Sequence, residues 1–511
     1  MTTTPSAPPF SIGYGTNGFT DHPLPAALEL LHECGYGAVA LTLGHPHLDP
    51  FAPDLDARLS RLRRRLDELD FRVVIETGTR FLLNPREKHR PALVDDDAAA
   101  RVDFLHRAVD IAAALNAECV SFFSGILPPG TGPETAWHRL EERVGEVLGH
   151  AAEKGVVLAL EPEPGMFVET VAQAHELRAR LGEPEGLRLT VDIGHCVVVE
   201  PGGIRGALME AGPLLANVQL DDMRSTAHEH LPFGEGEVDL PLALATLAEL
   251  EYRGVAAVEL PRHSFDAPGL ASRSMAALQG AWQDVQAERV VEQWLQQAVA
   301  RVAADPGALP AVFASAGRSV GRSPLKPAAD PTAVLHGSRS DYARSEFLRR
   351  LAGFLTPEEL AETLVELYNG GDSAERRGVL RGLGALASRE PGLPAPVVAA
   401  GLQVTAEALR TNETGLVAAA AGPFAAAHLD QHNWRHAVLK LIFMGVSIAA
   451  VTDLSHRADD ELARMAADFA AERRAAGRPV PDDVVLLLRS AAGSAAGGAA
   501  TPSTSLKESQ A

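Results

Sequence analysis

Four acidic residues stand at the same kind of place in this sequence, the downstream end of a short apolar run. The runs are Arg72-Val-Val-Ile-Glu, Val156-Val-Leu-Ala-Leu-Glu, Leu187-Arg-Leu-Thr-Val-Asp and Val255-Ala-Ala-Val-Glu, which end at Glu76, Glu161, Asp192 and Glu259. Strands of a parallel barrel end at one mouth, so we expect these carboxylates to lie close together. Because adjacent carboxylates repel one another, their convergence indicates a bound cation or shared protons.

The seventh predicted strand adds further oxygen donors near the same mouth, the amide of Gln219 and the carboxylates of Asp221 and Asp222. We predict a metal site with four ligands: Glu161, Asp192, Gln219 and Glu259. Hard oxygen ligands favour Mn²⁺ or Mg²⁺, with Zn²⁺ or Co²⁺ as alternatives. A cation there would polarise a carbonyl and ease deprotonation of the adjacent carbon. Two carboxylates on opposite faces of the substrate would then act as base and acid.

Other polar residues near the strand ends are candidates for binding a substrate. The predicted substrate-binding residues are Glu76, His89, Glu163, His195, Arg224, His228, His230 and Arg262. These residue types also have purely structural interpretations. A strand-end carboxylate can cap a helix or form an ion pair, His195 can orient Asp192, and Gln219 can hydrogen-bond to a neighbouring ligand. The charged loop around Arg80 and Lys88 fits either an anion site or a solvated loop.

Strand and helix patterns alternate through the first half of the chain. The predicted strands are Ser11–Asn17, Ala38–Gly44, Arg72–Thr77, Cys119–Ser124, Val156–Glu161, Leu187–Asp192, Ala216–Asp221 and Val255–Leu260. The helical patterns between them include Leu24–Cys34, Ala57–Leu69, Ala99–Leu115, Glu134–Glu153, Val171–Leu181 and Leu240–Leu250. Strict alternation over about 250 residues predicts an α/β fold, a TIM (β/α)8 barrel. A doubly wound sheet is the alternative, but no GxGxxG follows the first strand.

The strand patterns fade after about residue 274, and the helical patterns that follow predict an all-α helical domain. We divide the chain into a disordered N-terminus (1–9), a barrel (10–275), an all-α domain (285–490) and a disordered tail (491–511). In the all-α domain, Trp434, Leu439, Phe443 and Leu454 are predicted core residues, and Arg457 is a predicted partner in a structural ion pair.

The bulk composition excludes several classes of function. A net charge of −21 opposes binding to nucleic acid or to anionic membranes. The three cysteines are far apart and lack CxxC spacing, which argues against a disulfide framework or a thiolate zinc site. The longest apolar stretch, Leu441 to Val451, is too short to span a bilayer, and no signal-peptide pattern is present. We therefore expect a cytoplasmic protein without a transmembrane segment.

The barrel region resembles the sugar phosphate isomerase/epimerase superfamily, the xylose-isomerase-like TIM barrels. The resemblance is carried by Leu160-Glu-Pro-Glu, Val191-Asp-Ile-Gly-His, Asn217-Val-Gln-Leu-Asp-Asp, Gly234-Glu-Gly-Glu-Val-Asp and Val258-Glu-Leu. It implies that Glu161 and Glu259 bind the metal and move the proton at the substrate α-carbon. It also implies that Asp192 is a metal ligand and that His195 contacts substrate oxygens.

One position of the seventh strand departs from that family. Where these barrels usually have a His ligand, this sequence has Gln219, whose amide oxygen is a weaker donor. His228 or His230 in the following loop could supply an imidazole instead.

The helical half resembles the EboA family, whose name refers to metabolite traffic. The matching segments include Gly317-Arg-Ser-Val-Gly-Arg, Thr411-Asn-Glu-Thr, Trp434-Arg-His-Ala-Val-Leu-Lys and Arg457-Ala-Asp-Asp-Glu-Leu-Ala. The resemblance implies a place among proteins that move a small metabolite, so proteins of that pathway are expected partners.

Three functions are compatible with these features. The first is a divalent-metal-dependent isomerase or epimerase of a sugar, sugar phosphate or related hydroxy-carbonyl metabolite. The second is a non-catalytic protein that binds such a metabolite and hands it over. The third, an endonuclease-IV-like DNA repair enzyme, requires a His-rich zinc cluster and a cationic face, and the acidic composition opposes it.

Overall fold

The computed structural model describes residues 7–388 and 392–488. Residues 1–6 of the predicted disordered N-terminus and the whole predicted tail, 491–511, lie outside the described residues. The chain divides into two compact units, and the division falls between Gln286 and Ala287. The long helix α9 (Ala267–Ala304) contains this division.

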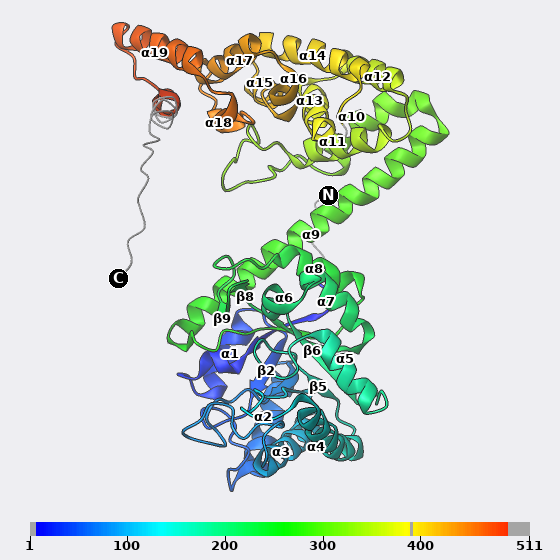
Figure 1. Cartoon of the computed structure of the whole chain (residues 1–511), viewed down its shortest axis with the longest axis vertical. Helices are drawn as coiled ribbons and strands as arrows, with labels where there is room; N and C mark the ends of the chain where they lie inside the picture. The colour runs from blue at the N-terminus through cyan, green and yellow to red at the C-terminus, as the bar shows by residue number, and fades with distance from the viewer. Residues whose placement is uncertain (1–6, 389–391, 489–511) are drawn as a thin grey trace, which may run out of the picture. The chain divides into compact units, whose positions relative to one another are not determined.

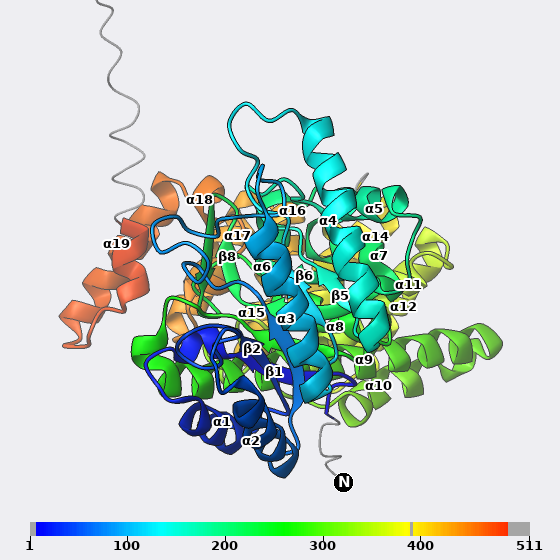
Figure 2. The same ribbon diagram turned by 90° about the horizontal axis from the view of Figure 1, so that it is seen from below.

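The first unit is a closed barrel of eight parallel strands, in the order β1-β10-β7-β6-β5-β4-β3-β2. These strands form the inner layer, and the helices form the outer layer (Figures 1 and 2). The strands are β1 (Ser11–Gly15), β2 (Ala38–Thr42), β3 (Arg72–Glu76), β4 (Val120–Phe122), β5 (Leu158–Leu160), β6 (Leu187–Asp192), β7 (Leu215–Leu220) and β10 (Val255–Val258). The TIM barrel predicted from the sequence is thus confirmed.

Helices connect the strands on the outside of the barrel. They are α1 (Leu24–Glu33), α2 (Leu55–Glu68), α3 (Ala99–Leu115), α4 (Pro133–Lys154), α5 (Val171–Arg180), α6 (Ile193–Val199), α7 (Gly203–Ala211) and α8 (Leu240–Glu249). The six helices expected between the strands are present within about two residues of the predicted bounds. The sequence analysis missed α6 and α7, because both are short and follow β6 almost directly.

A two-stranded antiparallel hairpin was also missed. It consists of β8 (Asp222–Arg224) and β9 (Ala227–Leu231) and lies between β7 and α8. Its sequence is polar and charged, so the hydrophobic alternation that marks a buried strand is absent. This hairpin brings His228 and His230 to the barrel.

The barrel interior has two layers of different character. A separate cluster of small apolar side chains fills one layer: Ala38, Ala40, Val74, Cys119, Ala159, Val255 and Ala257. Successive side chains of a strand point to opposite faces, so the residue two positions further on also points inward. Glu76 follows Val74, Glu161 follows Ala159 and Glu259 follows Ala257 in this way. The strand register therefore directs these carboxylates into the mouth.

The second unit contains only helices among its described elements of regular structure, which confirms the predicted all-α region (Figure 1). Besides the end of α9, its helices are α10 (Leu309–Ser319), α11 (Arg339–Leu351), α12 (Pro357–Gly370), α13 (Ser373–Ala387), α14 (Ala395–Arg410), α15 (Thr414–Ala420), α16 (Pro423–His428), α17 (Gln431–Phe443), α18 (Leu454–Arg457) and α19 (Asp460–Ala475). Capping boxes start α11, α12 and α13.

The predicted core of this unit needs one correction. Trp434 is fully buried, and Leu439 and Leu454 pack against the same core cluster. Phe443 was predicted as a core residue but is 74% exposed. It is the last residue of α17 and lies off the buried stripe that Trp434 begins at the start of that helix.

Arg457 stabilises the fold differently from the expected ion pair. Its guanidinium donates to the backbone carbonyls of Ala425, Ala426 and Leu429, at 2.8–3.0 Å, and lies over the ring of Trp434. These carbonyls are at the C-terminal end of α16. That of Ala425 also accepts the backbone N–H of Leu429, whereas those of Ala426 and Leu429 lie beyond the last helical hydrogen bond.

We predict that Arg457→Met lowers the free energy of unfolding by about 2–3 kcal/mol, because it leaves the carbonyls of Ala426 and Leu429 without a donor. The matched control is Arg464→Met, which removes an arginine that is 59% exposed and pairs with Glu461. That change should cost under about 1 kcal/mol. Urea unfolding of both variants measures the difference, and equal losses would contradict this role for Arg457.

Candidate functional site

The mouth of the barrel encloses a cavity of about 370 Å³, which is large enough for a small metabolite. Most of the residues predicted to act at the site line it: Glu76, His89, Glu161, Glu163, His195, Gln219, His228, His230, Glu259 and Arg262. Arg80 and Lys88 line it too. Asp192 does not line the cavity and is almost completely buried behind it. Arg224 is exposed on β8 and is not among the lining residues.

Asp192 combines a structural role with a free oxygen. Its Oδ1 accepts hydrogen bonds from the backbone N–H groups of Gly194 at 2.7 Å and His195 at 3.1 Å, which caps the start of α6. Its Oδ2 is buried without an N–H or hydroxyl donor, and the Asp192 carboxylate is also within hydrogen-bonding reach of the Asp221 carboxyl, whose pKa is raised by burial. The helix-cap interpretation of a strand-end carboxylate therefore holds for one oxygen, and the other oxygen remains available for a ligand.

Gln219 also presents a buried oxygen without a partner. The side-chain Oε1 of Gln219 has no hydrogen bond, whereas its side chain hydrogen-bonds to Glu76. This hydrogen bond lowers the pKa of Glu76, which is the effect of a donor, so the amide N–H₂ group faces Glu76. Asn217 donates to the same carboxylate at 3.1 Å. Glu76 therefore fixes the orientation of the Gln219 amide and leaves its oxygen free.

Two further carboxylates are held by hydrogen bonds from residues that the sequence analysis did not single out. Asn17 Nδ2 donates to Glu259 Oε1 at 2.8 Å. Ser121 Oγ lies 3.4 Å from Glu161 Oε2. Asn17 lies just after β1, and Ser121 lies within β4. A search for polar residues in and just after each predicted strand would have found both of them.

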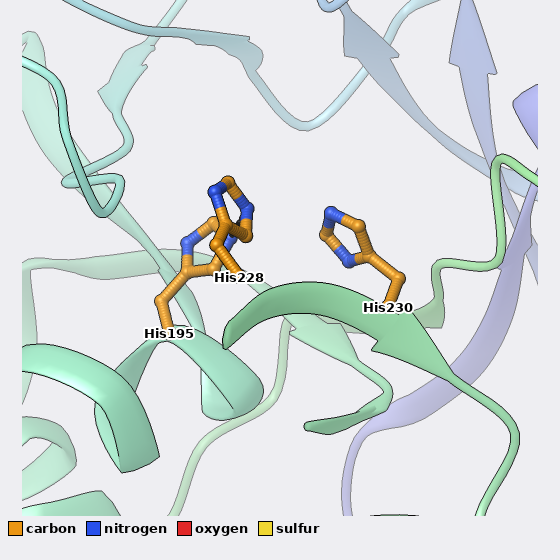
Figure 3. Close-up of side chains that lie close together, drawn as sticks. All are labelled: His195, His228 and His230. Carbon is orange, nitrogen blue, oxygen red and sulfur yellow. Dashed lines mark hydrogen bonds between the residues drawn. The ribbon is translucent and has the colours of Figure 1, made fainter. Parts of the chain in front are cut away.

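Three histidines form one wall of the cavity (Figure 3). His195 Nε2 lies 3.0 Å from His228 Nε2, and His195 Nδ1 lies 3.3 Å from the carbonyl oxygen of Pro162. His230 Nδ1 lies 2.7 Å from Asp221 Oδ2. These contacts join the hairpin to the start of α6.

Asp222 organises the loop above the mouth and does not enter the cavity. Its carboxylate accepts hydrogen bonds from the backbone N–H groups of Gly234, Gly236 and Val238 at 2.8–2.9 Å, and from Met223. A Cβ on Gly236 would lie 2.4 Å from Asp222 Oδ1, so only glycine fits there.

Burial raises the pKa of most carboxyl groups in the mouth. Desolvation, followed by repulsion from Glu259, holds the pKa values of Glu76 and Glu161 well above the ordinary range. Desolvation also raises the pKa of Glu259, and it raises that of Glu163 to about 7. For Asp192 burial opposes ionisation, but attraction to His195 and the other nearby donors keeps its pKa below the ordinary value.

The histidines divide into two kinds. Burial lowers the pKa of His195 to about 4 and that of His228 to about 3, so both are neutral at pH 7. Burial also opposes the charge on His230, but the hydrogen bond to Asp221 and the nearby carboxylates raise its pKa to about 10. Without a bound cation, His230 is thus the imidazolium that balances part of the negative charge.

The donor set fits a divalent cation. Glu161, Asp192 and His195 each offer an atom within 4.8 Å of the others, and so do Asp192, Asp221 and His230. Buried Asp192 Oδ2 and Gln219 Oε1 accept no hydrogen bond from an N–H or hydroxyl group of the described residues, although the Asp192 carboxylate can share a proton with Asp221. Buried acceptors of this kind cost free energy unless a donor or a cation meets them. Glu259 belongs to none of the groups of closely spaced donors, although it lines the same cavity.

Comparisons with known proteins agree with this fold. Residues 28–281 match the family model described as a xylose isomerase-like TIM barrel, and residues 358–489 match that of the metabolite traffic protein EboA. A fructoselysine 3-epimerase of Shigella flexneri is 24% identical over 267 residues, which cover 51% of this chain and 94% of that protein. The L-ribulose-5-phosphate 3-epimerase UlaE of Escherichia coli is 24% identical over 230 residues, 43% of this chain and 80% of that protein. A solved L-ribulose 3-epimerase covers 55% of this chain and 97% of its own, at 17% identity and a TM-score of 0.45.

Residues 28–281 thus match the xylose isomerase-like TIM barrel family, and residues 358–489 match the EboA family. Both resemblances expected from the sequence motifs are confirmed. The curated relatives of the barrel are sugar epimerases. Among the helices of residues 7–388 and 392–488, none is both long and apolar enough to cross a membrane.

We predict that Asp222→Ala lowers the free energy of unfolding by about 3 kcal/mol or more, because several N–H groups lose a charged acceptor. Asp222→Asn keeps one acceptor oxygen and should lose less. The control is Asp239→Ala, which removes the ordinary N-cap of α8 and should cost about 1 kcal/mol. Denaturant unfolding tests this, and a loss for Asp222→Ala no larger than the control would contradict it.

The raised carboxyl pKa values predict opposite effects of pH on the metal-free and metal-loaded protein. Protonated Glu163 contributes stability that is fully present below pH 4.5 and is lost as pH rises through its folded pKa of about 7. Between about pH 4.5 and 7, the chelator-treated protein should lose up to about 1.4 kcal/mol per pH unit from the proton of Glu163.

Added Mn²⁺ favours the deprotonated carboxylates, so the stabilisation that it gives should increase over the same pH range. Thermal unfolding with and without Mn²⁺ measures both trends. A constant Mn²⁺ effect across this range would contradict a carboxylate site.

Proposed function

We propose that the barrel is a divalent-metal-dependent epimerase or isomerase of a sugar, a sugar phosphate or a related hydroxy-carbonyl metabolite. One observation carries the proposal. One oxygen of Gln219 in the cavity lining and one oxygen of Asp192 behind it are buried without an N–H or hydroxyl donor, and the Glu161 carboxylate is buried close to Asp192. A divalent cation is the partner that suits such oxygens, with Mn²⁺ or Mg²⁺ preferred and Zn²⁺ or Co²⁺ as alternatives.

Glu161, Asp192, Gln219 and Glu259 would hold the cation. When bound, the cation would polarise a substrate carbonyl and orient the neighbouring hydroxyl. Asp192 is fixed in place by its cap on α6, and the Gln219 amide is fixed by Glu76. Such support keeps ligand atoms in position without a reorganisation cost during the reaction.

Glu161 and Glu259 would transfer the proton. They directly follow β5 and β10, which are separated by β6 and β7 in the closed strand order, and both line the same cavity. One carboxylate would take the proton from the carbon beside the carbonyl, and the other, in its acid form, would return a proton to the opposite face. The configuration at that carbon is then inverted, with no net gain or loss of protons. The pKa values of both groups are raised towards neutral pH. A carboxyl group with such a pKa can both accept and donate a proton easily.

The rest of the cavity is suited to a polar substrate. His89, Glu163, His195, His228, His230 and Arg262 would contact substrate hydroxyl groups, and Arg80 and Lys88 would meet an anionic group if the substrate carries one. The names of the curated relatives include both a phosphorylated and an unphosphorylated sugar substrate, so we keep both classes in the proposal.

The EboA domain would connect this chemistry to metabolite traffic. We propose a barrel domain at about 10–275 and an EboA-like domain at about 285–490, acting in the cytoplasm with other proteins of one pathway. The match of residues 358–489 to the EboA model supports this arrangement.

Gln219 supports a second candidate function. An amide oxygen binds a cation more weakly than the imidazole expected there, so a barrel of this kind would suit binding and handover of a metabolite without turnover. The two functions differ in one observable property, the exchange of a substrate proton with solvent.

We predict that the protein, loaded with Mn²⁺, exchanges the α-proton of a suitable ketose or ketose phosphate with deuterated water. Glu161→Gln and Glu259→Gln should each lower this exchange by at least about 100-fold, because each removes one of the two proton carriers. The control is Glu235→Gln, an exposed glutamate of the loop after β9. NMR of a panel of ketoses and their phosphates measures the exchange. Binding without exchange in the wild type would favour the handover function, and unchanged exchange in both variants would contradict the assigned roles.

A further inference from the structure

The three histidines of the mouth are arranged like ligands of one cation (Figure 3). His195 lies in the first turn of α6, and His228 and His230 are two positions apart on β9, so their side chains share one face of that strand. The ring centroids lie 4.7–5.6 Å apart. One nitrogen of each ring lies within 4.8 Å of the others.

In the rings of His195 and His230, a hydrogen bond at Nδ1 leaves Nε2 as the nitrogen that can bind a cation. The Pro162 carbonyl accepts only, so His195 Nδ1, 3.3 Å away, carries the proton and Nε2 has a lone pair. His230 Nδ1 donates to Asp221 Oδ2 at 2.7 Å, so a cation would bind at Nε2 in exchange for the proton that the metal-free imidazolium carries there. Metal-binding histidines are usually oriented by such a bond from the other ring nitrogen to a carbonyl or a carboxylate.

The closest pair of nitrogens needs a proton or a cation between them. His195 Nε2 and His228 Nε2 are 3.0 Å apart, and two lone pairs would repel at this distance. Zinc with Zn–N bonds of about 2.0–2.1 Å holds its tetrahedral ligands about 3.3–3.4 Å apart. A small rotation of the His228 ring would therefore meet this geometry.

We propose that His195, His228 and His230 form a three-imidazole cation site of the zinc type, beside the oxygen-donor site. Imidazole nitrogens suit zinc better than Mg²⁺ or Mn²⁺, and three protein ligands leave a fourth position for water or a substrate oxygen. The cation would face the substrate space, because all three rings line the cavity that Glu161 and Glu259 also line. Glu163 Oε1, at 3.9 Å from His228 Nε2, is close enough to interact with a ligand in the fourth position.

This site is separable from the oxygen-donor site of the proposed epimerase. His195 lies near both, within 4.8 Å of donors from Glu161 and Asp192. His228 is not part of the oxygen-donor set, so its removal affects the imidazole site alone. Glu259 belongs only to the oxygen-donor set, so its removal has the opposite selectivity.

Cobalt(II) binding to the full-length, chelator-treated protein tests the proposal. A tetrahedral, nitrogen-rich Co²⁺ site absorbs visible light strongly, whereas a six-coordinate oxygen site absorbs weakly. The wild type should show the strong band, and His228→Gln should lose it together with more than about 100-fold in Zn²⁺ affinity. Asp221→Asn, which weakens the support of His230 and also alters the contact with Asp192, should lose about 10–100-fold. The control is His45→Gln, because the His45 side chain lines the same cavity but is 70% exposed.

The outcomes separate this site from the proposed function. Glu259→Gln should keep the strong Co²⁺ band while proton exchange is lost. A wild type without the strong band, or a His228→Gln protein that folds and keeps it, would overturn the proposal. X-ray absorption of the zinc-loaded wild type gives a test that needs no variant. Three imidazole ligands are expected, and fewer than two would overturn the site.

Discussion

The mouth of this barrel depends on one constraint, the burial of several carboxylates with few positive charges near them. Glu76, Glu161 and Asp192 are each at most 7% exposed, and Asp221 is completely buried. A carboxylate removed from water is tolerated only when it is protonated, hydrogen-bonded or paired with a cation. The surrounding structure supplies amide and hydroxyl donors and one imidazolium, His230, but leaves several oxygens unsatisfied. A bound cation of the proposed site would relieve the remaining repulsion.

The barrel fold produces this arrangement with little freedom. Parallel strands end at one rim, and the two-residue period of each strand places a carboxylate directly above a small inward-facing residue such as Ala159 or Ala257. Asp192 is fixed because it is the N-cap of α6. One of its oxygens caps the helix, and the other takes no part in the cap. Structural and functional roles of a strand-end residue are therefore compatible, because a carboxylate has two oxygens that can serve different partners.

Much of this could be predicted from the sequence, and the remainder could not for identifiable reasons. Apolar runs and helical periodicity located the barrel strands, since burial of each element leaves a local pattern. The hairpin that carries His228 left no such pattern, because its residues are polar. Its position depends on contacts with α6 and on Asp222, whose four backbone partners are up to 16 positions away. The orientation of the Gln219 amide was equally hidden, because it is set by Glu76 on a distant strand. Phe443 was misplaced because periodicity near the end of a helix does not show where packing stops.

The histidine wall also bears on the third hypothesis considered at the outset. Three imidazoles meet one of the two requirements of an endonuclease-like site, but a net charge of −21 opposes the cationic face that DNA requires. The central claim, that oxygen donors from separate strands surround one cation, is tested most directly by anomalous diffraction from crystals grown with Mn²⁺. We predict an anomalous peak bounded by Glu161, Asp192, Gln219 and Glu259. A fully occupied Mn²⁺ peak elsewhere, with those four side chains bonded only to protein groups, would contradict it.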